Sequence, residues 1–61
     1  MKIRDVLRML AQDGWALKNQ EGSHRQYVHP VKDGKVTVSG HPHEEVRPKT
    51  LYSIRKQAGL K

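Results

Sequence analysis

The sequence predicts a small α+β domain in which one helix, three strands and a second helix follow one another along the chain. Three observations support this prediction. Residues 3–13 and 48–58 repeat apolar side chains every three or four positions, which is the period of a helix face. Between them lie three short runs with the pattern of strands, separated by turns that contain glycine. The 61 residues leave room for one domain, which we expect to span residues 1–61.

The first predicted helix covers residues 3–13. Its apolar side chains fall on one face, at i, i+3, i+4 and i+7 spacing: Ile3, Val6, Leu7 and Leu10. Gly14 follows, and glycine accepts the left-handed conformation that commonly ends a helix.

The three strands are predicted over residues 15–19, 23–29 and 35–39. In the first, Trp15 and Leu17 point one way while Ala16 and Lys18 point the other. Residues 19–22 form the turn that follows, with Gly22 at its tight position. Pro30 closes the second strand, and Asp33-Gly34 is a strong hairpin pattern. The third strand places Val36 and Val38 on one face.

The second helix is predicted to begin at Pro48, after a loop over residues 40–47. Proline suits the first turn of a helix, where its missing N–H is not needed. Leu51, Ile54 and Ala58 mark one face, and Gly59 resembles a glycine C-cap.

Sequential strands joined by short turns favour an antiparallel meander. Two helices of about 11 residues can cover one face of such a sheet, which leaves the other face open to water. This two-layer α-β-β-β-α plan is that of the double-stranded-RNA-binding domain.

The charge balance points to a polyanionic partner. Twelve Lys and Arg oppose six Asp and Glu, a formal net charge of +6. So dense a positive field in a small body attracts nucleic acid or an acidic protein. The chain lacks cysteine, an apolar stretch near the roughly 20 residues of a membrane span, and the apolar block of a signal peptide. We therefore expect a cytoplasmic protein with no membrane partner.

Of the four histidines, position favours His24. Strand alternation puts Arg25, Tyr27 and His29 on one face and His24 on the other. If Tyr27 packs under the helices, His24 lies on the open face, beside the Gly22 turn. Ser23 would then point away from the imidazole, so we reject it as a nucleophile paired with His24 and expect its hydroxyl to close the turn. On this evidence alone, a solvated histidine at a strand end remains the simpler interpretation.

Metal chemistry finds little support in the sequence. His41 and His43 do not complete a tetrahedral site by themselves, and the acidic residues form no cluster. We therefore expect no metal and no cofactor. A metal-free ribonuclease can use the 2′-hydroxyl of RNA as nucleophile, with a base, a cation and an acid. His24 can serve as base or acid, but no second histidine is placed to complete the proton transfer.

Several cations are candidates for RNA contacts. Arg25 and Lys18 lie near His24 in the predicted sheet, and Lys35 is a third cation that could supply positive charge. Lys49, Arg55 and Lys56 lie in or near the second helix, where a solvated face is the plainer interpretation. Tyr52 could stack on a base or pack on the surface, whereas Trp15 is assigned mainly to the core.

The chain resembles the HicA toxins over nearly its whole length. The resemblance rests on the Gly22-Ser23-His24-Arg25 turn, the His29-Pro30 strand end, the Val36-Thr37-Val38 strand, the His41-Pro42 loop and the run from Pro48 to Leu60. Two departures stand out: Lys49 occupies a position where glycine is common, and Ser39-Gly40 replaces a strand end that contains proline.

The resemblance implies a toxin with the double-stranded-RNA-binding fold that cleaves mRNA and halts translation. His24 occupies the position of the family's active histidine. We expect RNA contacts from Lys18, Ser23, Arg25, Lys35 and Lys49. A HicB-type antitoxin is implied as partner, forming a hetero-oligomer that covers the open face. The alternative is a non-catalytic RNA-binding module on the same scaffold.

Overall fold

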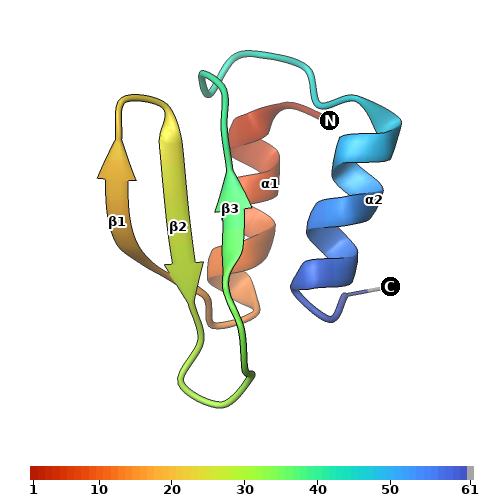
Figure 1. Cartoon of the computed structure of the whole chain (residues 1–61). Coiled ribbons are helices and arrows are strands. Elements are labelled where there is room, and N and C mark those ends of the chain that lie inside the picture. The colour runs from red at the N-terminus through yellow and green to blue at the C-terminus, as the bar shows by residue number, and fades with distance from the viewer. Residues whose placement is uncertain (61) are drawn as a thin grey trace.

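The computed structural model describes residues 1–60 and confirms the predicted order of elements (Figure 1). Lys61, the last residue of the expected domain, lies outside the described residues. The elements are α1 (Ile3–Gln12), β1 (Ala16–Glu21), β2 (His24–Val28), β3 (Val36–Val38) and α2 (Pro48–Gln57). The predicted third strand loses one residue at each end, and β1 runs two residues further than expected, to Glu21.

The strands form one antiparallel sheet in the order β1-β2-β3. A two-residue turn, Gly22-Ser23, joins β1 to β2, and Glu21 pairs with His24 across it. Gly22 has φ 58°, while Ser23 does not have positive φ. A positive φ at the first turn position only is the pattern of a type II′ turn, which matches the twist of the flanking strands. The register shifts between Leu17 and Asn19, where Lys18 forms a bulge.

Both helices cover one face of the sheet, as predicted, and they do so unevenly. Figure 1 shows β1 at the side of the sheet away from α2, with α1 behind β3. All six residues of β1 are exposed. Leu17, which we expected to share the face of buried Trp15, pairs with buried Tyr27 but is 50% exposed. The helices do not extend far enough to cover it.

The core lies between the sheet and the helices, where the predicted apolar faces meet. Its buried members are Ile3, Val6, Leu10, Trp15, Tyr27, Val36, Val38, Ile54 and Ala58. Leu7, Met9, Val46, Leu51 and Leu60 pack against them and are partly buried. The helix faces expected from the sequence are therefore the faces that pack, and Tyr27 lies under the helices as predicted. Within residues 1–60, neither helix has the length and apolarity needed to cross a bilayer.

The loop after β3 caps the first turn of α1. The first N–H groups of a helix have no partner inside the helix. Here the Ile3 N–H donates to the Glu44 carbonyl at 2.9 Å, and the Arg4 N–H donates to the Pro42 carbonyl at 3.0 Å. The Asp5 carboxylate accepts the Lys2 N–H at 2.9 Å. These bonds fix the loop at the end of the molecule where the β1–β2 turn lies (Figure 1).

Candidate functional site

His24 begins β2 directly after the Gly22-Ser23 turn, and its side chain is exposed. Its neighbours Arg25 and Tyr27 are buried against the helix side, with exposures of 9% and 8%. Because successive side chains of a strand point to opposite faces, His24 belongs to the face that the helices leave open. The structure thus places His24 where the alternation predicted. Within residues 1–60, no hydrogen bond or ion pair engages its imidazole.

The strand register determines which residues share the open face with His24. Glu21 pairs with His24 across the turn. One step along the sheet, Asn19 of β1 and Thr37 of β3 both pair with Gln26. We call these three residues the polar row. Sequence reasoning missed both Glu21 and the polar row, because cross-strand neighbours follow from register and not from local pattern.

Arg25 lies on the opposite side of the sheet from His24. Its guanidinium Nη1 donates to the Gly40 carbonyl at 2.9 Å and to the Ser23 carbonyl at 3.3 Å. It therefore ties the β1–β2 turn to the loop that caps α1. The burial of Arg25 gives it this positioning role, and it no longer belongs among the cations we expect at an RNA backbone.

The other expected contact residues are spread over two layers. Lys18, in the bulge of β1, and Lys35, directly before β3, are exposed cations of the sheet. Ser23 is half-buried, and its backbone carbonyl accepts a hydrogen bond from Arg25. Lys49 is exposed in the first turn of α2, across α1 and β3 from the β1–β2 turn (Figure 1). The register places Lys35 beside the Val28 end of β2, away from His24, and Lys49 lies on a helix outside the sheet.

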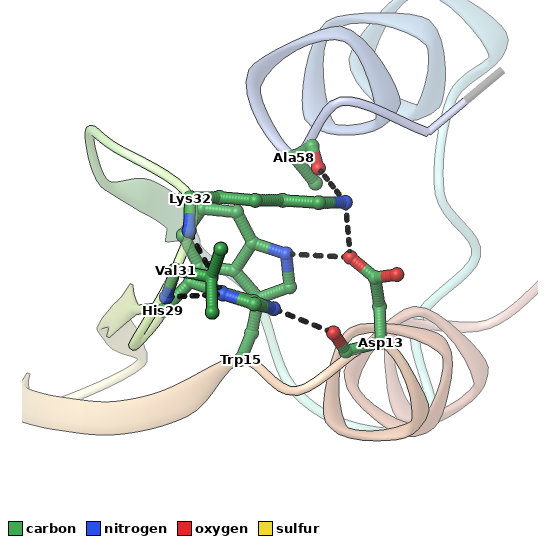
Figure 2. Close-up of polar contacts among 6 residues, drawn as sticks. All are labelled: Asp13, Trp15, His29, Val31, Lys32 and Ala58. Atoms are coloured by element: carbon green, nitrogen blue, oxygen red, sulfur yellow. Dashed lines mark hydrogen bonds and ion pairs between the residues drawn. The ribbon is translucent and has the colours of Figure 1, made fainter.

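His29, at the other end of β2, has both ring nitrogens engaged (Figure 2). Its Nε2 lies 2.7 Å from the Asp13 carbonyl oxygen, which can only accept, so Nε2 carries the proton. Its Nδ1 accepts the backbone N–H groups of Val31 and Lys32, both at 3.0 Å. Both ring nitrogens are therefore occupied by backbone groups, an arrangement suited to structure and not to proton transfer.

The carboxylate of Asp13 joins the same group of contacts. Its Oδ2 accepts from Lys32 Nζ at 2.6 Å and from Trp15 Nε1 at 3.1 Å, and Lys32 Nζ also donates to the Ala58 carbonyl at 3.1 Å. The hydrogen bond from Lys32 lowers the pKa of Asp13. These residues (Asp13, Trp15, His29, Lys32 and Ala58) form what we call the Asp13 cluster. It joins the ends of both helices to the β2–β3 loop.

His41 and His43 stack on each other, with ring centroids 6.0 Å apart and planes at 10°. Both are exposed in the loop after β3. Within residues 1–60, no three His, Asp or Glu side chains come together in a group that could hold a metal ion.

The chemistry available at the open face is that of one accessible imidazole. Neutral His24 can accept a proton, and its imidazolium can donate one. The exposed cations Lys18 and Lys35 of the sheet can attract phosphates.

Comparison with known proteins places the chain in one family. Residues 3–60 match the family model described as the HicA toxin of bacterial toxin-antitoxin systems. The match includes both helices, the whole sheet and His24. A search of curated proteins gave no match.

Proposed function

The chain belongs to the HicA family, the toxins of bacterial toxin–antitoxin systems, and from this premise we propose that it is an endoribonuclease that cleaves mRNA with His24 as its catalytic residue. The observation that carries the proposal is the exposed His24 imidazole on the open face. Its position after the glycine–serine turn supports the assignment. The net charge of +6 suits an RNA substrate.

The reaction we propose uses the nucleophile that RNA carries. The 2′-oxygen attacks the adjacent phosphorus as the P–O5′ bond breaks, which yields a 2′,3′-cyclic phosphate and a 5′-hydroxyl. A base must take the 2′-hydroxyl proton, and an acid must give a proton to the leaving oxygen. His24 performs one of these transfers, and a cation near the phosphate stabilises the developing charge. This chemistry needs no metal, so cleavage should persist with a chelator present.

We further propose that a HicB-type antitoxin neutralises the toxin in the cytoplasm. A partner that covers the open face would bury His24 and exclude RNA. The small core and the exposed cations of the sheet favour such a hetero-oligomer.

A second candidate is a non-catalytic RNA-binding module. It is favoured by one observation: within residues 1–60, His24 has no hydrogen-bonded companion that would act as the second proton-transfer group. Both functions predict RNA binding that weakens with salt, because neutralised phosphates release counterions.

The experiment that separates them compares His24→Ala with His43→Ala. Both remove an exposed imidazole, but only His24 lies on the sheet. Cleavage of labelled single-stranded RNA is measured in chelator, with protein purified free of contaminating nuclease. We expect His24→Ala to lose about 10²- to 10⁴-fold in rate while keeping its fold and most of its RNA affinity. The His43→Ala protein should cleave like the parent. Equal cleavage by both variants would refute His24 as the catalyst, and a parent that never cleaves would favour the binding module.

A further inference from the structure

We propose that the polar row is a nucleobase subsite, at which an unpaired base of the RNA substrate is recognised by hydrogen bonds. This inference deepens the proposed function and rests on it for the substrate. Its physical basis is the register of the three strands. Asn19, Gln26 and Thr37 are brought side by side across the full width of the sheet.

The polar row lies one step from His24 on the same face. Gln26 is two residues after His24 in β2, so their side chains leave the same side of the sheet about 7 Å apart along the strand. A nucleotide whose phosphate meets His24 therefore has its base within reach of Gln26. Asn19 and Thr37 are exposed and Gln26 is half-buried between them, so the row is accessible to a ligand.

The chemistry of the row suits a base better than a phosphate. Phosphates are bound mainly by cations and backbone N–H groups. A carboxamide instead presents a donor and an acceptor side by side, which complements the edge of a base. The side-chain Oδ1 of Asn19 accepts the Gln20 N–H at 2.9 Å, which leaves the Asn19 side-chain NH₂ group to bind other partners. The cations Lys18 and Lys35, near either end of the row, supply contacts for flanking phosphates.

Stacking does not explain base binding at this face. The chain has one Trp, two Tyr and no Phe. Trp15 and Tyr27 are buried on the helix side, with exposures of 3% and 8%, and the exposed Tyr52 lies on α2. A site without an aromatic platform must distinguish bases by hydrogen bonds, which confers sequence preference. It also requires single-stranded RNA, because the Watson–Crick edges of a duplex are already paired.

The test separates base contacts from backbone contacts. Affinities of His24→Ala protein, in which cleavage is blocked, are measured for a short single-stranded RNA and for the same strand with abasic positions. We expect the complete strand to bind more tightly. Adding Gln26→Leu or the isosteric Thr37→Val should reduce that advantage, by about fivefold for Gln26.

Two control substitutions keep the interpretation specific. Lys35→Met should weaken both strands equally, as a phosphate contact does. Gln12→Leu makes the same chemical change as Gln26→Leu, on the exposed side of α1, and should alter neither affinity. In the cleaving parent, sequencing of cut ends should show a base preference next to the cleaved bond that Gln26→Leu removes.

Three results would overturn the subsite: equal binding of complete and abasic strands, an advantage that survives Gln26→Leu, or no binding of either strand. A Gln26→Leu variant that loses only antitoxin affinity would also overturn it, and would make the row a protein contact. If base-dependent binding is present and the parent does not cleave, the proposed catalytic function fails and the subsite stands. If the parent cleaves through His24 without base preference or base-dependent binding, the subsite fails and the proposed catalytic function stands.

Discussion

The two ends of β2 each place a histidine next to a glycine, with opposite consequences. At its start, His24 is exposed beside the Gly22 turn, and no hydrogen bond within residues 1–60 holds its ring. Just after its end, His29 has both nitrogens occupied and packs edge-on against Trp15, with ring centroids 5.2 Å apart. The same residue type therefore has a structural role at one end of the molecule and, in the proposed function, a chemical role at the other. The difference comes from what surrounds the ring.

The largest expected effect is that substitution of His24 removes cleavage while substitution of His29 removes stability. His24→Ala should abolish most cleavage and leave the melting temperature near that of the parent. His29→Ala removes three hydrogen bonds and leaves their backbone partners without the imidazole, which costs about 2–4 kcal/mol. For a domain of this size, that lowers the melting temperature by roughly 10–25 °C. Thermal unfolding followed by circular dichroism, together with cleavage below the transition, measures both.

The different roles of the two histidines would be contradicted by a His29→Ala protein as stable as the parent, or by a His24→Ala protein that unfolds. The conservative His29→Gln sharpens it, because the glutamine amide can donate and accept and should recover part of the lost stability.

The glycines beside the two histidines give the second effect. An added Cβ on Gly14 would lie 2.7 Å from His29 Nε2, and Gly14 has φ 101°. At Gly22, with φ 58°, an added Cβ would meet nothing within 4 Å. Gly22→Ala therefore carries only the backbone cost of about 1–2 kcal/mol, and Gly14→Ala adds displacement of the His29 ring. Urea unfolding should rank Gly14→Ala as clearly less stable, and equal costs would show that the His29 ring moves aside freely.

The sequence was sufficient for the features that depend on local pattern. The order of elements and the exposure of His24 both follow from the spacing of apolar residues and the alternation along β2. The strand register could not be predicted from the sequence, because the pairing of Asn19 with Gln26 depends on a two-residue turn and on the bulge at Lys18. Contacts between segments that are distant in the sequence could not be predicted either.

Arg25 and His29 illustrate those distant contacts. Arg25 is buried because the Gly40 carbonyl, from the loop after β3, meets its guanidinium. His29 is engaged because the end of α1 and the β2–β3 loop converge on it. The Gly40 carbonyl is 15 residues from Arg25 in the sequence, and the Asp13 carbonyl is 16 residues from His29.

The smallest effect is a pH dependence at the His29 end of the molecule. The hydrogen bond from Lys32 holds the pKa of Asp13 below its ordinary value. A carboxyl whose pKa is lower in the folded state stabilises the fold above its unfolded pKa, near 4, and loses that contribution as pH falls through the folded pKa. Stability measured by urea unfolding should therefore decline below about pH 4, and Asp13→Asn should flatten part of the decline.

Asp5 provides the internal control for that measurement. The Lys2 N–H lowers the pKa of Asp5 as well, so some acid sensitivity should survive in Asp13→Asn and disappear only when Asp5→Asn is added. Asp13 and Lys32 are partly exposed, with side-chain exposures of 27% and 36%, so salt should weaken the Asp13 contribution. An Asp13→Asn protein with the full acid sensitivity of the parent would show that the Lys32–Asp13 pair adds no stability, and that the hydrogen bonds of His29 hold that end of β2.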